Sequence, residues 1–414
     1  MHVRVLLASH LKAWRKILAI ATAALAACAP VHQSAVRSES TPRIVASEAI
    51  GSPSFAFGSG GDLELLAVTA NGGRNQLRAF VSHDGGDTFK DLGLVAPPAS
   101  DVTLSGETRP PLVMSREELL YAVWRDDGPK PGIVVAAHDW RKPGFTTPVA
   151  VRDIESPRDS GFPDMAVAPD GSVDVVWLDG RDYDPKLRDA SSVYFARSTD
   201  GGKSFGRNVR VSADTCSCCR PTVAIDSNER VYVAWRHNFN DVRDMAVATS
   251  VDRGKTFSPL VRVAKDGWVI HGCPESGPSL LSVGNRLYIA WFTVGADSRP
   301  RVLASWSDDR GRSFAAPVEL STGVLDANHP MLFAGKPRGV WVAFEGRDAR
   351  AQAGWSPFQT YVVRIDVLGR RAIAITKSSA NQEYPFAVMR DAQSLFIGIS
   401  SAGHAAMLRA RIEP

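Results

Sequence analysis

The sequence lacks a surplus of charge of either sign once its first residues are set aside. The 414 residues contain 48 Lys and Arg against 44 Asp and Glu. Four of the basic residues lie near the start, at Arg4, Lys12, Arg15 and Lys16, and the remaining 44 match the 44 acidic residues. No basic stripe is interleaved with aromatic residues, so we expect no nucleic-acid partner.

The N-terminal apolar run lacks the length of a membrane span. Ile17 to Ala27 follows a basic stretch and ends in Leu25-Ala26-Ala27-Cys28, whereas a spanning helix needs about 20 apolar residues. This pattern is typical of a secretory signal over residues 1–27, and its ending resembles a bacterial lipobox. The resemblance implies acylation of Cys28, with palmitate among the chains, and a lipid anchor in the cell envelope. An ordinary signal peptide, with Cys28 as a bystander, is the alternative.

The residue after Cys28 is Ala29 rather than Asp. By the same resemblance this favours the outer membrane, facing the periplasm. Residues 28–42 are rich in Ser, Thr and Pro and have no periodicity, so we expect the lipidated N-terminus to continue as a flexible tether. Residues 43–414 then form the folded domain.

Cysteine is scarce, with five residues in the chain. Apart from Cys28, they lie in two short segments, as Cys216, Cys218 and Cys219 and as Cys273. An even number in an oxidising envelope predicts two disulfides, one of them joining Cys273 to the triplet. Neighbouring cysteines strain disulfide geometry, so two alternatives stay open. Thiolates with His271 or His329 nearby would suit a soft metal, Cu(I) or Zn(II), and a redox-active thiol is the other possibility.

The sequence contains a unit that is repeated along the chain, and this unit is clearest from Phe162 to Phe205. A proline, Pro163, opens the unit, and an alternating apolar run ends at Trp177, 14 positions later. Related units begin at Pro53, Pro110, Pro163, Pro221, Pro278, Pro330 and Pro385. Repeats of short antiparallel strands predict an all-β fold, a β-propeller of seven blades. Six blades is the alternative, if the second repeat is not a blade.

A turn motif, S-x-D-x-G-x-[TS]-F, occurs four times, with its aspartates at Asp84, Asp200, Asp252 and Asp309. The carboxylate can accept hydrogen bonds from backbone N–H groups of a tight turn, the Gly can take a positive φ, and the Phe can fill the space between sheets. The motif resembles the Asp-box of the sialidase and BNR-repeat families. The resemblance implies a structural turn on the face opposite the functional one.

We expect residues Arg43 to Ile50 to close the propeller as the outermost strand of the last blade, which would hide an open edge. Four antiparallel strands per blade place the loops before the repeat prolines, together with the loops between second and third strands, on one face, called here the proline face. Ligands of propellers often bind on such a face. The positions before the prolines are Ser52, Arg109, Phe162, Arg220, Gly277, His329 and Tyr384.

The sialidase resemblance implies particular roles on the proline face. Arg109, Arg220 and either Arg236 or Arg347 would form a carboxylate clamp, since guanidinium groups bind carboxylates through paired donors. Glu383 and Tyr384 would supply the nucleophile pair, and Asp164 the acid. The family's aromatic-Arg-Ile-Pro motif has only an echo, at Pro42 to Val45.

Two main hypotheses follow. The first is an envelope lipoprotein whose proline face, with Arg109, Arg220, Arg236, Arg347 and His329, binds a glycan, a polypeptide or a metal ion. The second is an exo-acting glycoside hydrolase resembling sialidases. A Cu or Zn site at the four cysteines is a third possibility.

Overall fold

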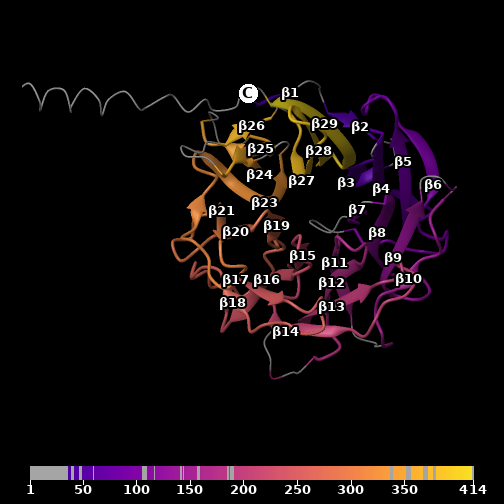
Figure 1. Cartoon of the computed structure of the whole chain (residues 1–414). Coiled ribbons are helices and arrows are strands. Elements are labelled where there is room, and N and C mark those ends of the chain that lie inside the picture. Colours follow the sequence, from indigo (N-terminus) through magenta and orange to yellow (C-terminus); the bar gives the residue numbers. More distant parts are fainter. Residues whose placement is uncertain are drawn as a thin grey trace, which may run out of the picture. The chain divides into compact units, whose positions relative to one another are not determined.

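The computed structural model describes residues 36–38, 42–45, 49–58, 60–104, 110–115, 117–139, 142, 144–155, 159–183, 186, 191–335, 339–350, 356–366, 372–375 and 379–412. They belong to one compact unit, Val36–Glu413, that contains strands and turns and, within these ranges, no helix. Its sheets follow one another around a ring in a propeller arrangement (Figure 1). None of the described residues forms a helix that could cross a membrane. The predicted signal at 1–27, Cys28 and Arg109 lie outside the described residues.

Four sheets each contain four consecutive antiparallel strands. The first has β3 (Ala49–Phe57), β4 (Leu63–Asn71), β5 (Arg74–Ser82) and β6 (Lys90–Leu94). The second has β7 (Leu112–Met114), β8 (Leu119–Asp126), β9 (Gly132–Asp139) and β10 (Val149–Ala150). Farther along are β19 (Ser279–Val283), β20 (Arg286–Thr293), β21 (Arg301–Ser307) and β22 (Val318–Glu319). They are followed by β23 (Val324–Ala334), β24 (Val340–Asp348), β25 (Gln359–Arg364) and β26 (Ile373–Ala374).

An eight-stranded sheet lies between the second and third of these. Its first half has β11 (Ser160–Val167), β12 (Val173–Asp179), β13 (Ser191–Ser198) and β14 (Val209–Thr215). Its second half has β15 (Thr222–Ile225), β16 (Val231–Phe239), β17 (Val242–Ser250) and β18 (Val261–Arg262). The halves are joined by the single pair of Thr215 and His237, and they also pack against each other through a shared apolar cluster.

The last sheet joins the two ends of the folded unit. It contains β27 (Gln382–Met389), β28 (Ser394–Ser401) and β29 (His404–Ile412), with β1 (Val36–Ser38) and β2 (Arg43–Ile44) both paired to β29. The expected pairing of the N-terminal segment with the last repeat is therefore present, but its bounds differ from the predicted Arg43 to Ile50. It begins at Val36, within the predicted tether, and ends at Ile44. Ala49 and Ile50 belong to β3 and pair with Thr69 and Val68 of β4.

The repeat prolines mark irregular points in the first strands. Strand register shifts around Pro53, Pro163, Pro330 and Pro385, between Ile50/Ser54, Gly161/Asp164, Asn328/Met331 and Glu383/Phe386. Proline has no N–H to give to a β-ladder, so within sheets it is found at bulges and edges. Each of these four prolines therefore interrupts the regular pairing, which is present on both sides of it.

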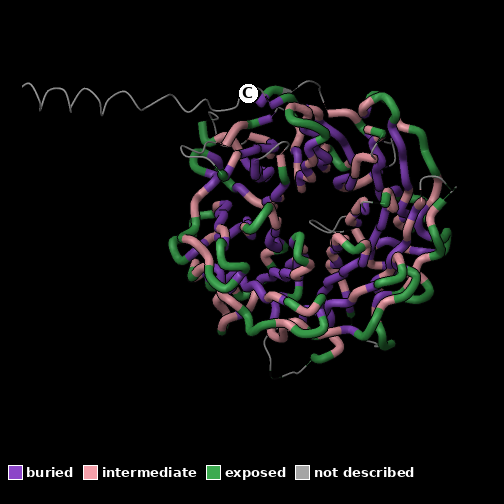
Figure 2. Tube along the Cα trace, in the orientation of Figure 1, coloured by how far each residue is buried: buried purple, intermediate pink, exposed green. Residues whose placement is uncertain are grey.

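The large side chain 13 or 14 positions after the proline is fully buried on the second strand of its group. Trp124, Trp177, Trp235, Trp291 and Phe344 are each at most 1% exposed. Each lies in an apolar cluster that draws on two neighbouring strand groups. Burial is accordingly concentrated in the strands, whereas the loops are exposed (Figure 2). The core is thus distributed between groups of strands rather than collected in one place.

The four S-x-D-x-G-x-[TS]-F turns share one hydrogen-bond pattern. In the second turn, Asp200 accepts bonds from the backbone N–H of Ser204 at 3.0 Å and from its hydroxyl at 2.6 Å. Gly254 in the third turn has φ +84°, and a Cβ there would lie 2.0 Å from the Phe195 ring. The Phe of every motif packs against an apolar cluster, namely Phe89, Phe205, Phe257 and Phe314.

These turns predict a loss of stability in acid. Hydrogen bonds from Ser or Thr hydroxyls, Ser204 for Asp200, hold the pKa of Asp200, Asp252 and Asp309 at about 2. The unfolded-state pKa is about 3.9, so this stabilisation is complete above that value and is lost as the pH falls through about 2. Replacing Asp200 with Asn should flatten the pH dependence of the unfolding free energy across this window, as measured by urea titration. Replacing the exposed Glu117 with Gln is the control, and equal curves for both variants would contradict the prediction.

Candidate functional site

The loops on the proline face contact one another around the ring. Contacts between successive loops or first strands are Ser52 Oγ to Glu383 O at 3.1 Å, Ser54 Oγ to Pro110 O at 2.7 Å, Arg220 Nη1 to Asp164 at 3.3 Å, the Cys218–Cys273 disulfide, and Ser276 Oγ to Asn328 Oδ1 at 2.7 Å. The positions equated from sequence, Ser52, Phe162, Arg220, Gly277, His329 and Tyr384, are therefore parts of one rim; Arg109 lies outside the described residues.

Three rim residues with ring side chains adopt a left-handed backbone conformation. Phe162, His329 and Tyr384 have φ of +55°, +48° and +53°, and each directly precedes a repeat proline. Positive φ is uncommon for residues with a Cβ, and a following proline favours extended conformations instead. Such backbone strain costs about 1–3 kcal/mol per residue and persists only where surrounding contacts enforce it.

Glu345, on β24, supplies such contacts for two of them. Its side chain is buried; Oε1 lies 2.7 Å from His329 Nδ1, and Oε2 accepts a 2.5 Å hydrogen bond from the Tyr384 N–H. The His329 and Tyr384 rings lie 4.4 Å apart between centroids. Burial raises the pKa of the neighbouring Glu383, and the charge of Glu345 adds to the increase. The proposed nucleophile pair, Glu383 and Tyr384, thus lies beside a second carboxylate and a histidine.

The arginines expected to form a carboxylate clamp have other partners. Arg220 pairs with Asp164 in the central cavity, and Arg347 pairs with Asp326 and donates to Ser356 O. Arg236 is only 1% exposed, and its guanidinium donates to the carbonyls of Ser276, Arg243 and Phe292. The prediction that Arg236 is a surface ligand contact is wrong, because its side chain turns inward to satisfy these carbonyls.

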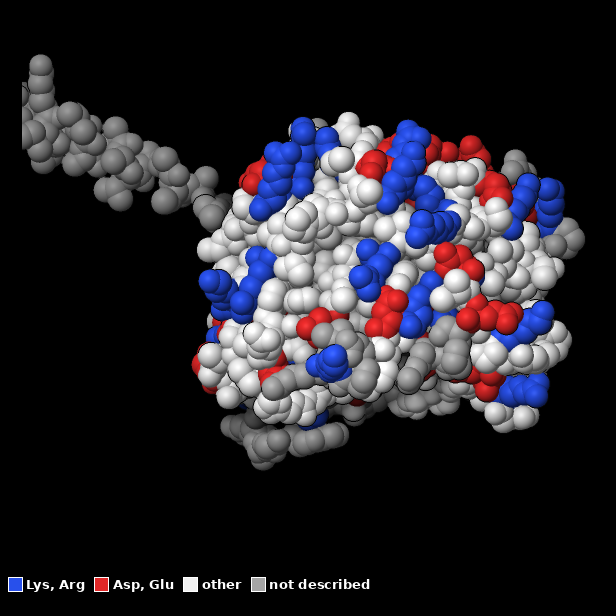
Figure 3. All heavy atoms as spheres, turned by 90° about the horizontal axis from the view of Figure 1, so that it is seen from below, with Lys and Arg blue, Asp and Glu red and all other residues white. Residues whose placement is uncertain are grey.

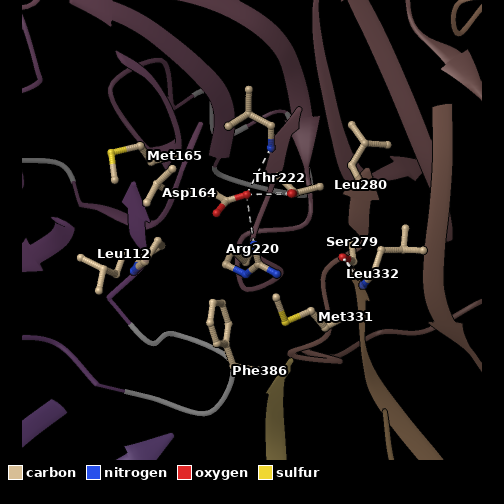
Figure 4. A pocket seen from close by; sticks show the side chains of 13 residues that line it. Leu112, Asp164, Met165, Arg220, Thr222, Ser279, Leu280, Met331, Leu332 and Phe386 are labelled. Carbon is tan, nitrogen blue, oxygen red and sulfur yellow. Dashed lines mark hydrogen bonds and ion pairs between the residues drawn. The ribbon is translucent and has the colours of Figure 1, made fainter. Parts of the chain in front are cut away.

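Asp164 and Arg220 project into a cavity of about 190 Å³ between the first strands (Figure 4). Asp164 also accepts hydrogen bonds from the Thr222 hydroxyl at 2.7 Å and the Val223 N–H at 3.2 Å. The remaining wall is largely apolar, with Leu112, Met165, Leu280, Met331, Leu332 and Phe386 among its residues. Ligand sites for drug-sized molecules are typically about 300–1,000 Å³, so this cavity suits a polar network better than a sugar.

A larger groove runs over the proline face beside β9 and β11. A cavity of about 950 Å³ is lined by Pro129, Lys130, Pro131, Arg152 and Ile154, among others. It shares Arg125, Asp159 and Ser160 with a smaller pocket of about 160 Å³ that ends at Phe162 and Ser217. We refer to the two together as the face groove.

Arg125 organises the middle of the face groove. Its guanidinium pairs with Asp127 and Asp159 and donates to the Ser160 carbonyl. Asp127 also accepts a 2.5 Å hydrogen bond from the Thr103 hydroxyl. The side chains of Asp127 and Asp159 are 42% and 84% exposed, so they present carboxylates to the solvent in a fixed position.

The cysteine-bearing loops meet as expected. Cys218 and Cys273 form a disulfide, whereas the second predicted disulfide is absent, because Cys216 and Cys219 are not disulfide-bonded. Their Sγ atoms lie 3.4 Å apart, and Cys216 Sγ lies 3.7 Å from Cys218 Sγ. The hydrogen bond with Cys219 lowers the pKa of Cys216 to about 7, despite burial that opposes the change.

The sulfur atoms of Cys216, Cys218 and Cys219 all lie within 4.8 Å of one another, and we call this group the cysteine cluster. Phe162 packs against it. Neither histidine considered from sequence joins the group among the described residues. His271 is 74% exposed beside Asp241, and His329 is held by Glu345 and the Glu275 carbonyl.

Charges of both signs are interspersed over the side of the molecule seen in Figure 3. This distribution agrees with the balanced composition of the chain beyond its first residues. It offers no single-sign field for a polyanion.

Sequence reasoning missed the face groove and the bridging role of Glu345. Arg125 to Asp127 was recognisable as a loop of the proline face, since it ends the second strand of its repeat. The partner Asp159 comes from the following repeat, and only the folded chain brings it to Arg125. The same applies to Glu345, which bridges two repeats to reach Tyr384.

No protein-family model and no curated protein matches the sequence. Among solved structures, a protein of unknown function from Dyadobacter fermentans is 14% identical, covers 91% of this chain and 99% of its own, and has a TM-score of 0.51. An alpha-L-arabinofuranosidase of Fusarium graminearum, solved with arabinobiose, is 14% identical with a TM-score of 0.52 and covers 80% of this chain and 98% of its own. A Hadza microbial sialidase is 13% identical, covers 82% and 73%, and has a TM-score of 0.49. The first two of these likenesses, with TM-scores above 0.5, show the fold alone, a β-propeller.

The positions of the arginines predict no cleavage of sialosides. A clamp requires free guanidinium donors that converge on one carboxylate, and Arg220, Arg236 and Arg347 are held by separate partners. The purified protein should therefore release no fluorophore from a fluorogenic sialoside, with a known sialidase as the positive control. Turnover that disappears in a Tyr384→Phe variant would contradict this and restore the glycosidase hypothesis.

Proposed function

We propose that this protein is a lipid-anchored propeller of the bacterial cell envelope that binds an extended glycan in the face groove, without glycosidase chemistry. The observation that carries the proposal is the continuity of the groove, from Pro129 to Phe162 and Ser217, through the shared residues Arg125 and Asp159. A chain of linked sugars needs such a long, open site rather than a closed cavity.

The chemistry of the groove supports a glycan. Sugar hydroxyls both donate and accept hydrogen bonds. The exposed carboxylates of Asp127 and Asp159 can accept bonds from them, and the Ser217 hydroxyl can accept or donate. The apolar faces of sugar rings can pack against Phe162 and Ile154. The fungal arabinofuranosidase of similar fold was solved with arabinobiose, which makes a short arabino-oligosaccharide a reasonable first probe.

We also propose that the ring has seven blades, with the eight-stranded sheet counted as two. The single pair between its halves supports this count, as does the apolar cluster through which the halves pack face to face. The four S-x-D-x-G-x-[TS]-F turns would then be Asp-boxes of the sialidase and BNR-repeat kind. Their shared hydrogen bonds to the aspartate carboxylate support this assignment.

A soft-metal site at the cysteine cluster is the second candidate function. Three sulfur atoms within 4.8 Å of one another favour it, because soft metals such as Cu(I) prefer thiolate ligands and Zn(II) also accepts them. Metal analysis of the purified protein, before and after reduction, is the direct measurement.

Filling the inner end of the face groove should abolish glycan binding. Ser217 is exposed at the end of the smaller pocket, so a Ser217→Trp variant would place an indole where a sugar ring should lie. Isothermal titration with arabino-oligosaccharides and sialyllactose should show binding to the wild type and at least ~10-fold weaker binding to this variant.

Ser227→Trp is the matched control. Ser227 is also exposed, and the two serines lie before and after β15, so they occupy opposite ends of one strand. The control should bind as the wild type does. Equal affinity of wild type and Ser217→Trp, or no binding of any oligosaccharide by the wild type, would contradict the proposal.

Lipid anchoring gives a separate prediction. A Cys28→Ser variant cannot be acylated at that position, and the remaining signal should still direct export. In a bacterial host the wild type should fractionate with the outer membrane and incorporate labelled palmitate, whereas the variant should appear in the soluble periplasmic fraction. A wild-type protein that is soluble and unlabelled would leave Cys28 as a bystander of an ordinary signal peptide.

A further inference from the structure

One sulfur of the cysteine cluster, Cys218 Sγ, is placed to form either a disulfide or a bond to a metal ion. Cys218 is disulfide-bonded to Cys273, yet its Sγ also lies 3.7 Å from Cys216 Sγ and within 4.8 Å of Cys219 Sγ. Cys218 therefore needs no large movement to exchange its disulfide partner for a metal ion. We infer that the Cys218–Cys273 disulfide is a gate, and that its reduction creates a three-thiolate Cu(I) site from Cys216, Cys218 and Cys219. This inference rests on the proposed metal site and adds its ligands, its metal and its control.

The spacing of the sulfurs suits a three-coordinate ion. Ligands placed about 2.3 Å from a central metal in a trigonal plane would be about 4.0 Å from one another. The separations from Cys216 Sγ are 3.4 Å to Cys219 and 3.7 Å to Cys218, and no pair exceeds 4.8 Å. Only small side-chain adjustments are then needed to admit the ion.

The number of ligands favours Cu(I) over Zn(II). Structural zinc takes four ligands, usually in a tetrahedron. The group found among the described residues offers three sulfurs and no histidine or carboxylate, and Cys273 is not a member of it. Soft thiolates select Cu(I), which accepts low coordination numbers. All three cysteines are at most 8% exposed, so the bound ion would be shielded from water and oxidants.

Two buried arginines can compensate the negative charge of the metal–thiolate complex. Three thiolates and one Cu(I) have a net charge of −2, which is unfavourable in a buried site unless it is compensated. Arg236 is 1% exposed, its backbone carbonyl accepts a 3.0 Å bond from the Cys216 N–H, and the described bonds of its guanidinium go to neutral carbonyls. Arg243 is also buried, and the charges of both arginines act on Cys216.

The two sulfurs of the disulfide differ in solvent exposure. Cys273 is exposed, whereas Cys218 is 8% exposed. A thiolate of a dithiol reductant can therefore attack Cys273 Sγ; the S–S bond breaks, and its electron pair leaves on Cys218 Sγ as a thiolate. The second thiol of the reductant then attacks the mixed disulfide, which releases Cys273 as a thiolate and leaves the reductant as a disulfide. Two electrons pass from the dithiol to the protein, and Cys218 becomes a ligand.

Anaerobic Cu(I) titration against a competing chelator tests the gate. All variants carry Cys28→Ser, which is itself the matched cysteine-to-serine control, because Cys28 is not part of the cluster. The oxidised protein should show two thiols under denaturing conditions and compete poorly for Cu(I). After reduction by a phosphine that is then removed, one Cu(I) should bind, with three Cu–S contacts in X-ray absorption spectra.

Two further variants test the role of the Cys218–Cys273 disulfide separately from that of the metal ligands. Cys273→Ser leaves Cys218 without a disulfide partner, so this variant should bind Cu(I) without any reduction. Cys216→Ser should weaken binding by more than ~100-fold even after reduction, since loss of a direct ligand exceeds the effect of losing an outer partner. Thermal melting of each apo variant shows that it is folded.

The outcomes are distinct. Equal binding by oxidised and reduced protein would keep the metal site and overturn the gate. No binding by the reduced protein or by folded Cys273→Ser would overturn the metal site as well. Absence of thiols in the oxidised, denatured protein would mean that Cys216 and Cys219 also form a disulfide, and this would overturn the thiol pair on which the inference depends.

Discussion

The structure depends on a backbone constraint near the start of the repeats, where a proline without an N–H interrupts the regular pairing of the first strand. At Phe162, His329 and Tyr384 the residue before that proline is forced to a positive φ, a conformation that the proline itself disfavours. The strain is sustained by contacts from other repeats, such as the Glu345 carboxylate that receives the Tyr384 N–H. A feature set locally by sequence is therefore stable only when the ring is assembled. Polar contacts between repeats accordingly occur at the bulges, as between the Ser52 hydroxyl and the Glu383 carbonyl.

The two kinds of repeated loop divide their roles. The S-x-D-x-G-x-[TS]-F turns satisfy their own hydrogen bonds within a few residues, as Asp200 does with Ser198 and Ser204, and their Phe side chains join the apolar clusters. They need nothing from the rest of the chain except a surface to pack on. The loops of the proline face instead take partners from other repeats, and they vary in length and sequence. Variable loops on a rigid scaffold are where binding sites are generally found, and the face groove fits this rule.

Much of the fold could be predicted from sequence because its determinants are local. The proline-to-tryptophan interval fixes the buried position of residues such as Trp177, and the turn motif fixes its own geometry. The site was harder to predict from sequence, because the residues that pair in it come from different repeats. The sequence places Arg236 in a loop that should face the ligand, whereas the residue lies on β16 and its guanidinium binds neighbouring carbonyls in the interior. No spacing in the sequence distinguishes it from Arg125, whose partners Asp127 and Asp159 keep it at the groove. The meeting of the cysteine loops followed from the order of the repeats, but which sulfurs would bond did not.

The face groove and the cysteine cluster share a wall, and this links the two proposals physically. Phe162 packs on the cluster and also lines the inner pocket, while Ser217 belongs to the same short loop as Cys216 and Cys218. A change in the bonding of Cys218 must therefore alter the constraint on a loop that the ligand would touch. Coupling between two sites is reciprocal in free energy. If reduction of the disulfide weakens the binding of a ligand in the groove, the bound ligand must therefore oppose reduction by the same free energy. The redox state of Cys273, which is exposed, would then change the affinity of the face groove for its ligand without any movement of the strand groups. The reason is that the loop with Cys216, Ser217 and Cys218 is short and that its two cysteines are buried.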